Sequence, residues 1–462
     1  MPDALWTAEE IAQAVGGQVA GDFAATGVSI DTRSVEHGDL FVPLVGARDG
    51  HDFVAQAVAN GAAGVLAAKA VDAPAVMVAD TFKALEALGV AARERAPQCK
   101  RGAVTGSVGK TSVTRAIEAG LRLAGQAHAS VKSYNNHIGV PLTLARMPRD
   151  TERAVFEVGM NHADEIVPLS RFVQPHAVAI TTVGPVHIEN FPDGEAGVAR
   201  AKAEIFAGLR PGGVAVLNAD NRWFDYLKGE AEKVGARVWS FGEAAGATAR
   251  LTGFKVEDAG ATVSVDLRGE PITFSLLQTG VHWGPNSLCV LLMLEALDVP
   301  RETALAALAA FAPIEGRGAE KTIRIPGGAF TLVDESYNAN PVSMQAALKT
   351  LGARKVTGRR VIALTDMLEL GEDSERFHAE LAEPIASANV DVVFLAGVHM
   401  KSLWEALPPT RRGGYAEVTE KLTSVLAGAI QPGDVVMVKG SNGSKAGALA
   451  AALATLDLGE QG

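Results

Sequence analysis

A glycine-rich run near residue 105 carries the clearest chemical signal in the sequence. It reads Thr105-Gly106-Ser107-Val108-Gly109-Lys110-Thr111-Ser112. Glycines let such a loop curl so that its backbone N–H groups point at an anion, and the dipole of the following helix adds to the attraction. In a loop of this kind the lysine reaches the outer phosphates of a nucleotide, and the next hydroxyl ligates Mg²⁺. The run therefore predicts a phosphate loop in which Lys110 and Thr111 hold phosphate and metal.

The loop departs from the full G-x-x-x-x-G-K-[ST] pattern, because Val104 stands where the first glycine is expected. The shortened pattern also fits a tight turn between a strand and a helix, with a lysine in solvent. Other residues must decide between these two interpretations.

Polar residues next to predicted elements give further signals. Glu157 lies inside or at the end of the predicted strand 154–158, where a carboxylate is costly unless it is paired or ligates a cation. Beside a phosphate loop that cation would be magnesium, which takes oxygen ligands. His187 follows a second predicted strand, and Lys202 lies on the predicted helix 195–207. Alone, such a histidine is usually a hydrogen-bonding loop residue and such a lysine a solvated one.

The last third of the chain has three polar loops, each after an apolar run that predicts a strand. Asp334 ends the first run, and Tyr337, Asn338 and Asn340 follow it closely. Asn340 can cap a helix that begins at Pro341, but capping does not account for the other three. Ligands bind at the carboxyl ends of strands in open parallel sheets. We therefore expect three loops to gather at one edge of one sheet: 334–340, 366–371 and 439–443.

Length and composition limit the class of protein. With 462 residues the chain is too long for a single core. Its net charge of −11 argues against general nucleic-acid binding, which depends on an excess of Lys and Arg. The N-terminus has no secretory signal pattern, and no run is long and apolar enough to span a bilayer. We therefore expect a cytoplasmic protein without nucleic-acid or membrane partners. The two cysteines, Cys99 and Cys289, form no C-x-x-C pair and are expected to be buried thiols.

The pattern of apolar runs divides the chain into three predicted domains. Apolar strand-like runs alternate with helical patterns in each, which indicates α/β folds with parallel sheets. The run 247–278 alternates more like antiparallel strands. The expected boundaries are 1–97 for a small N-terminal domain, 98–313 for the central domain and 314–462 for the C-terminal domain.

Together these motifs resemble those of the Mur ligases, the ATP-dependent amide-forming family of peptidoglycan precursor synthesis. The resemblance covers nearly the whole chain, and the runs 336–344 and 366–371 are most similar to the branch of the family that adds D-alanyl-D-alanine. The matching runs are 31–34, 49–53, 105–111, 135–141, 157–160, 199–206, 336–344, 366–371 and 438–441.

The resemblance implies a fold and an activity. The N-terminal α/β domain would bind the UDP end of the substrate, the central domain would be a P-loop ATPase with a parallel sheet, and the C-terminal domain would be Rossmann-like and bind nucleotide and dipeptide. The enzyme would join D-alanyl-D-alanine to UDP-N-acetylmuramoyl-tripeptide through an acyl phosphate, forming ADP and phosphate. We expect it to act as a monomer.

The resemblance also implies residue roles. ATP would be held by 105–112 together with Asn286, Arg317 and Asp334. Two magnesium ions are implied, one at Thr111 and Glu157 and one at His187, with Lys202 contributing as a carbamate. The residues implied to be catalytic are Lys110, His187 and Lys202. Those implied to bind substrate are Thr32, Arg33, Ser34, Asn135, Asn136, Tyr337, Asn338, Asn340 and Lys439.

Three departures and two alternatives accompany this interpretation. Trp283 stands where the family often has asparagine, the segment 188–193 lacks the glycines usual after His187, and Ala203 replaces a frequent glycine. One alternative is a related Mur-type ligase with another acceptor, such as the meso-diaminopimelate-adding enzyme or folylpolyglutamate synthase; the run 336–344 argues against it. The other is a P-loop switch that hydrolyses ATP slowly without forming a bond, which the polar loops of the last domain disfavour.

Overall fold

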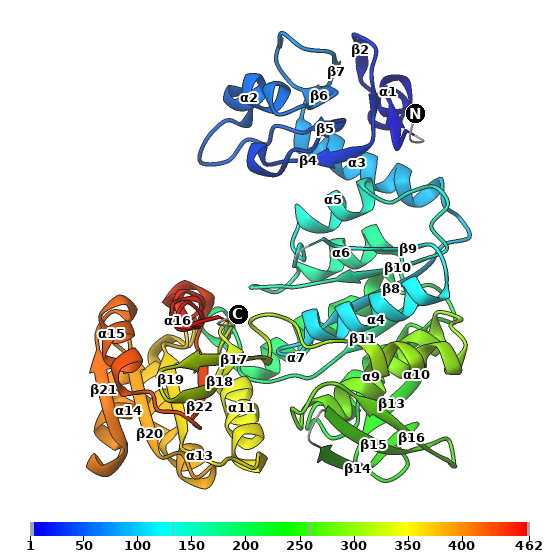
Figure 1. Ribbon diagram of the computed structural model, residues 1–462. Helices are drawn as coiled ribbons and strands as arrows, with labels where there is room; N and C mark the ends of the chain where they lie inside the picture. The colour runs from blue at the N-terminus through cyan, green and yellow to red at the C-terminus, as the bar shows by residue number, and fades with distance from the viewer. Residues whose placement is uncertain (1–3, 132, 258–259, 460–462) are drawn as a thin grey trace.

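The computed structural model describes residues 4–131, 133–257 and 260–459. It forms three α/β domains, which confirms the predicted fold class (Figure 1). Each domain has its own main sheet, and the chain completes one before starting the next. The boundaries expected near residues 97 and 313 stay a prediction.

The N-terminal domain has a five-stranded sheet in the order β2-β7-β6-β5-β4, and β1 pairs with β3 beside it. Its first helix begins at a capping box, in which the Thr7 hydroxyl accepts the Glu10 N–H and the Glu10 carboxylate accepts the Thr7 N–H. The elements are β1 (Trp6–Thr7), α1 (Ala8–Val15), β2 (Gln18–Ala20), β3 (Ala24–Ala25), β4 (Gly27–Ser29), η1 (Thr32–Ser34), β5 (Asp39–Phe41), η2 (Gly50–Phe53), α2 (Val54–Ala59), β6 (Gly64–Ala67), β7 (Ala75–Met77) and α3 (Thr81–Glu94).

The N-terminal domain rests on the central one through α3 and α5. Gly89 of α3 allows the close approach, because a Cβ there would lie 2.9 Å from the Pro141 carbonyl oxygen. Trp6 adds a link by donating its indole N–H to the Ala145 carbonyl at 2.8 Å.

The central domain is built on a nine-stranded sheet in the order β16-β15-β14-β13-β12-β11-β8-β10-β9. The seven strands from β9 to β14 in that order are parallel, while β15 and β16 add an antiparallel edge, as the alternation in 247–278 predicts. Its strands are β8 (Lys100–Thr105), β9 (Ala127–Ala129), β10 (Arg153–Glu157), β11 (Ala177–Ile180), β12 (Val214–Asn218), β13 (Arg237–Gly242), β14 (Ala249–Glu257), β15 (Gly260–Leu267) and β16 (Glu270–Leu276).

Helices cover both faces of the central, parallel part of this sheet, so the strands β10, β11 and β12 are almost entirely buried. Val104 belongs to the core under α4, α9 and α10, whereas its neighbour Ala103 belongs to the core on the opposite face. The predicted helix 195–207 is shorter than expected, because α7 gives way to a 3₁₀ turn at Glu204. The helices are α4 (Lys110–Ala124), α5 (Gly139–Ala145), α6 (Ile166–Val173), η3 (Ile188–Asn190), α7 (Glu195–Ala203), η4 (Glu204–Gly208), α8 (Phe224–Lys233), α9 (Trp283–Ala296) and α10 (Arg301–Ala310).

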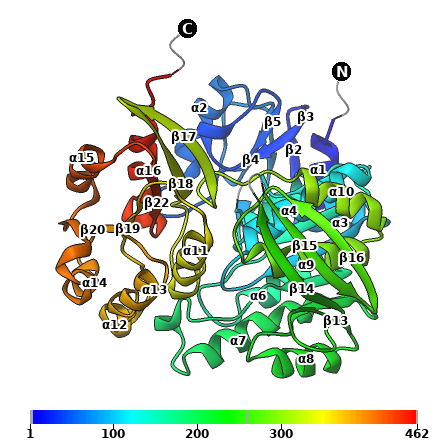
Figure 2. The ribbon, with the colours of Figure 1, turned by 60° about the horizontal axis from the view of Figure 1, so that its bottom comes forward.

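The C-terminal domain has a six-stranded sheet in the order β17-β18-β22-β19-β20-β21, parallel except for β17. Figure 2 shows α11 on the side of this domain that faces the central domain. The elements are β17 (Ala319–Ile325), β18 (Gly328–Glu335), α11 (Pro341–Ala353), β19 (Arg360–Thr365), η5 (Gly371–Asp373), α12 (Ser374–Ala379), α13 (Ala382–Ser387), β20 (Val392–Ala396), α14 (Met400–Ala406), η6 (Pro409–Arg411), β21 (Arg412–Ala416), α15 (Thr419–Ala429), β22 (Val435–Lys439), η7 (Asn442–Ser444) and α16 (Ala446–Ala454).

Two further expectations concern burial and membranes. Cys99 and Cys289 are free and buried, as predicted, and burial raises the pKa of Cys99 to about 11. Among the described residues, no helix is long and apolar enough to cross a membrane.

Candidate functional site

The phosphate loop has the backbone that its glycines predict. It joins β8 to α4, with Gly106 at φ 153° and Gly109 at φ 85°. A Cβ on Gly106 would lie 1.9 Å from the Thr181 hydroxyl oxygen, so no other residue fits without displacement. The structure therefore supports the phosphate-loop interpretation over a simple turn.

Hydrogen bonds hold this loop against the segment that follows β11. The Ser107 hydroxyl donates to the Gly184 carbonyl at 3.0 Å and accepts the Gly184 N–H at 2.9 Å. The Thr181 hydroxyl donates to the Val108 carbonyl at 2.5 Å. Neighbouring strand ends thus fix the shape of the loop before any ligand binds, which lowers the entropic cost of binding.

Lys110 begins α4 and curls back over its own loop. Its ammonium group donates to the Gly106 carbonyl at 2.7 Å. Desolvation lowers its pKa, and the nearby Glu157 carboxylate partly opposes that shift. An ammonium group at a helix N-terminus, above inward-facing amides, is suited to the outer phosphates of a nucleotide.

Glu157 ends β10 as the buried carboxylate of the site, with 3% of its surface exposed. The Thr111 hydroxyl donates to its Oε2 at 2.7 Å, and the Asn135 amide donates to its Oε1 at 2.7 Å. The structure thus brings together three of the predicted residues. Their hydroxyl, amide and carboxylate oxygens are hard donors that fit Mg²⁺. In the part of the chain that the structure describes, no group of three His, Cys, Asp or Glu residues could hold a metal ion alone.

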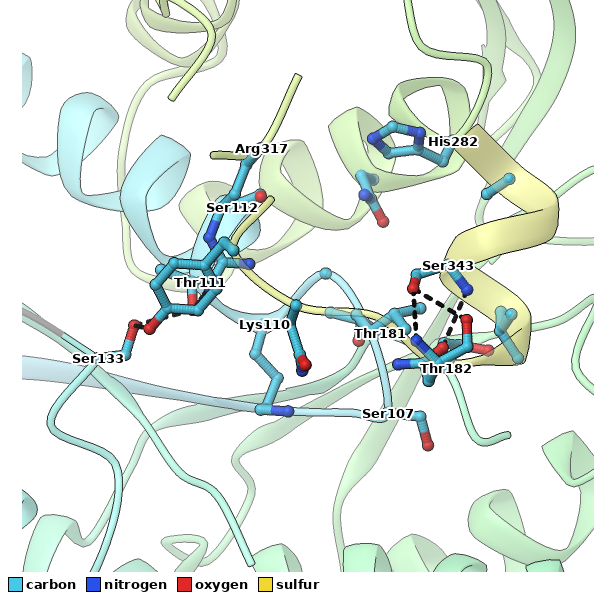
Figure 3. Close-up of a pocket in the computed structure, with 18 of the residues that line it drawn as sticks. Ser107, Lys110, Thr111, Ser112, Ser133, Thr181, Thr182, His282, Arg317 and Ser343 are labelled. Carbon is cyan, nitrogen blue, oxygen red and sulfur yellow. Dashed lines mark hydrogen bonds between the residues drawn. The ribbon is translucent and has the colours of Figure 1, made fainter. Parts of the chain in front are cut away.

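Arg317 reaches this cluster from the start of the C-terminal domain. Its guanidinium donates to the Thr111 hydroxyl oxygen at 2.9 Å (Figure 3). It stacks at 3.9 Å over the Tyr337 ring, whose hydroxyl donates to Ser133 at 3.0 Å. The phosphate loop and the C-terminal domain therefore meet at Thr111.

Asp334 supports Arg317 from behind rather than lining the cavity. Its Oδ2 accepts the Gly316 N–H at 3.0 Å, and its Oδ1 accepts the Ser336 N–H at 3.1 Å. The carboxylate therefore fixes the turn that carries Arg317.

His187 and Lys202 lie near Lys110, whose charge acts on both. His187 has a left-handed backbone, φ 53°, and burial lowers its pKa. Lys202 is 3% exposed, and across the described residues its ammonium group makes no hydrogen bond or ion pair. Burial, with the charge of Lys110 adding to it, lowers the pKa of Lys202 well below its ordinary value. This lysine is buried and not solvated, contrary to what its position on a helix indicates alone.

The polar loop after β18 also faces the cavity. Asn340 caps α11, because its side-chain oxygen accepts the Ser343 N–H at 2.9 Å. Lys439 ends β22 and donates to the Asn338 carbonyl at 3.0 Å, with its ammonium 3.5 Å from the Glu335 carboxylate. Burial lowers the pKa of Lys439.

Most of these residues enclose a cavity of about 440 Å³ between the central and C-terminal domains, whereas Asp334 and Lys202 do not line it. Asn286 lines it, and a Cβ on Gly109 would lie 3.5 Å from the Asn286 side chain. The predicted site residues that line the cavity are Ser107, Val108, Gly109, Lys110, Thr111, Ser112, Asn135, Glu157, His187, Asn286, Arg317, Tyr337, Asn338, Asn340 and Lys439.

Several predicted residues lie elsewhere. Thr105 ends β8 and Gly106 begins the loop, and neither lines the cavity. The Asn136 side-chain oxygen accepts the Gly139 N–H at 2.9 Å at the start of α5. Thr32, Arg33 and Ser34 form η1 in the N-terminal domain, outside the cavity. There the Arg33 side chain is 87% exposed and pairs with Asp31 at 2.6 Å. Figure 1 shows this domain beyond the central sheet, away from the C-terminal domain.

Sequence reasoning missed Ser133, Glu335 and the particular role of Glu369. Ser133 follows the short strand β9, and only the fold brings it to Thr111, at 3.2 Å between the hydroxyl oxygens. Glu369 lies in the run 366–371, whose position after β19 was the available signal; its Oε2 lies 2.5 Å from His187 Nδ1.

Comparison with known families is consistent with this site. The family model described as "Mur ligase family, catalytic domain" matches residues 24–107, "Mur ligase middle domain" matches 104–294, and "Mur ligase, glutamate ligase domain" matches 322–442.

Full-length relatives match as well. A protein of Rickettsia prowazekii is 31% identical, with 96% of this chain and 98% of that protein covered. One of Escherichia coli is 33% identical, with 94% and 95% covered. Both are named UDP-N-acetylmuramoyl-tripeptide--D-alanyl-D-alanine ligase. A crystal structure of MurF from Acinetobacter baumannii superposes with a TM-score of 0.85 at 29% identity, covering 97% of this chain and 99% of that one. The chain belongs to the Mur ligase family.

Proposed function

We propose that the protein is an ATP-dependent ligase that joins D-alanyl-D-alanine to UDP-N-acetylmuramoyl-tripeptide. The observation that carries this function is one cavity in which a phosphate loop faces the polar loop after β18, in a chain whose full-length relatives bear that name. We further propose that the enzyme acts in the cytoplasm and as a monomer.

The chemistry follows from the low reactivity of a carboxylate toward an amine. ATP would phosphorylate the terminal carboxylate of the tripeptide, and the neutral amine of the dipeptide would attack the acyl phosphate. Phosphate then leaves from a tetrahedral intermediate, forming the amide. Phosphoryl transfer brings two anions together, so the site must supply positive charge in a preorganised, enclosed setting.

Lys110 and Arg317 supply that charge from opposite sides. The Lys110 ammonium would exchange the Gly106 carbonyl for a phosphate oxygen, and the loop amides from Val108 to Ser112 would bind the others. Arg317 holds the nucleotide from the C-terminal domain, with Asp334 fixing its turn, while Asn286 lies beside Gly109.

Two magnesium ions, when bound, neutralise phosphate charge and orient the transferring group. Thr111 and Glu157 would hold one ion, because their oxygens already meet at 2.7 Å. His187 and Lys202 would hold the other. Burial and the charge of Lys110 lower the pKa of Lys202, which favours its neutral amine. The neutral amine would attack the carbon of CO₂, and loss of one proton would leave a carbamate with two ligand oxygens.

The remaining predicted residues would bind the two substrates. Thr32, Arg33 and Ser34 would hold the UDP end. The exposed Arg33 guanidinium would exchange its Asp31 partner for a diphosphate. Asn135 and Asn136 lie between that domain and the phosphate loop. The residues expected near the dipeptide are Tyr337, Asn338, Asn340 and Lys439.

The test is phosphate release from ATP and Mg²⁺ with UDP-N-acetylmuramoyl-tripeptide, with and without the dipeptide. We expect release that requires both substrates and a product heavier by the dipeptide less water. Replacing the dipeptide by meso-diaminopimelate or glutamate should give no product. Release with one of those amines would move the protein to another branch of the family, and release indifferent to every amine would indicate a nucleotide switch.

A further inference from the structure

Two functional loops from different domains touch at His187 and Glu369. His187 follows β11 of the central domain, and Glu369 follows β19 of the C-terminal domain. Oε2 of Glu369 lies 2.5 Å from Nδ1 of His187. That nitrogen is buried, and among the described residues it makes no hydrogen bond of good geometry. The Glu369 carboxylate is the group in contact with it, close enough to become its acceptor after a small rotation of the ring.

The backbone on both sides of the contact is unusual. His187 has φ 53° and Glu369 has φ 62°, a left-handed conformation that non-glycine residues seldom adopt. Such a conformation is strained and persists only where its surroundings require it. Nearby, a Cβ on Gly371 would lie 3.2 Å from the Glu189 Cβ, so the turns η3 and η5 are packed together. Both loops thus have a specific shape at the point where they meet.

We propose that Glu369 is a positioning residue that completes the His187 side of the site when the C-terminal domain docks. Its carboxylate accepts the Nδ1 proton of His187, which fixes the tautomer and leaves Nε2 unprotonated for the cavity that His187 lines. The role of Nε2 toward metal and phosphate rests on the proposed function, whereas the contact across the domains does not.

This contact would make completion of the His187 side of the site depend on docking of the C-terminal domain. The C-terminal domain carries the loop expected to bind the dipeptide, and the same domain supplies Glu369. The His187 side of the site is therefore complete only when the amine-binding domain is in place. Activation of the carboxylate is then coupled to the exclusion of water, which protects the acyl phosphate from hydrolysis.

The first experiment measures phosphate release against free Mg²⁺ in the full-length protein. Glu369→Ala should raise the Mg²⁺ concentration at half-maximal rate by about 10-fold or more, the range seen when a partner of a metal-ligating histidine is lost. Glu369→Gln, which keeps an acceptor oxygen, should show a smaller shift. Glu372→Ala is the matched control, because Glu372 is an exposed carboxylate in the same turn; its midpoint should equal that of the wild type.

The second experiment does not depend on activity. Small-angle X-ray scattering of the protein without ligands should give a larger radius of gyration for Glu369→Ala than for Glu372→Ala. In a His187→Ala background, Glu369→Ala should not change the radius of gyration further, because the partner of Glu369 is already absent. Thermal unfolding checks that each variant folds.

Two results would overturn the proposal. One is a Glu369→Ala variant that matches Glu372→Ala in both Mg²⁺ midpoint and radius of gyration. The other is an increase in the radius of gyration on Glu369→Ala that is as large in the His187→Ala background as in the wild type. If the wild type releases no phosphate in response to the dipeptide, the proposed function fails, and the scattering comparison still decides whether the contact docks the domains.

Discussion

Lysines with depressed pKa values surround the candidate site at the residue scale. Burial lowers the pKa of Lys110, Lys202 and Lys439, and Lys202 and Lys439 are each 3% exposed. Placing ammonium groups away from water costs free energy unless anions pair with them. The site therefore attracts anionic ligands, and ATP and a peptide carboxylate have the required charge.

Lys110→Ala should reduce ATP turnover by roughly 10²–10³-fold or more, because it removes a preorganised donor to the transferring phosphate. The measurement is phosphate release with both substrates present. Lys83→Ala is the control, since the Lys83 side chain is 70% exposed on α3. Near-normal turnover in Lys110→Ala would exclude the phosphate-loop assignment.

Lys202→Met should stabilise the protein while abolishing its activity. The folded-state pKa of Lys202 is lowered, so the unfolded chain binds more protons, and the amine lowers stability increasingly as pH falls below the ordinary value of 10.5. Removing it should raise the free energy of unfolding at pH 7, by on the order of 1–3 kcal/mol for an unpaired buried polar group.

Chemical denaturation of Lys202→Met and Arg200→Met, in buffers with and without CO₂, measures this effect. Arg200 lies on the same helix with its side chain 52% exposed, so its variant should change little. The gain from Lys202→Met should shrink when CO₂ is added, because the wild-type amine is then converted to a carbamate. An increase in the free energy of unfolding that is the same with and without CO₂ would contradict the carbamate. In a second test, added short carboxylates should partly restore the activity of Lys202→Ala.

At the scale of elements, the sequence predicts which polar residues lie at the ends of strands, but it does not predict which residues their side chains contact. Glu157 and Asp334 could be predicted because each carboxylate comes at the end of an apolar run. Glu157 ends β10 as expected, whereas β18 continues one residue beyond Asp334, to Glu335. Lys202 was misjudged from helical position alone, because burial depends on what packs against the helix. Ser133 had no local signal, since only the parallel order of β9, β10 and β8 brings it to Thr111.

Asn340 both caps α11 and lines the cavity, and two substitutions can distinguish its effect on stability from its effect on substrate binding. Asn340→Ser keeps a good N-cap, so its free energy of unfolding should stay near that of the wild type. Asn340→Ala removes the cap and should lower the free energy of unfolding by about 1 kcal/mol. If Asn340 also contacts the dipeptide, both variants should raise the KM for D-alanyl-D-alanine. A normal KM in Asn340→Ser would restrict this residue to capping.

At the scale of the whole molecule, the fold was predictable and the domain arrangement was not. Alternating apolar runs predicted three α/β domains, because each run must be covered by helices. Contacts between domains depend on single side chains far apart in the sequence, such as Arg317 with Thr111 and Glu369 with His187. The residues of η1 that are expected to bind the UDP end lie outside the cavity, and that proposed role requires a substrate long enough to reach from the N-terminal domain to the phosphate loop.

The most direct measurement follows an oxygen atom through the reaction. The tripeptide substrate is prepared with ¹⁸O in its terminal carboxylate and incubated with ATP, Mg²⁺ and D-alanyl-D-alanine, and the released phosphate is analysed by mass spectrometry. Ligation through an acyl phosphate predicts one ¹⁸O in each phosphate formed, together with a product heavier by the dipeptide less water. Unlabelled phosphate formed without that product would contradict the ligase account.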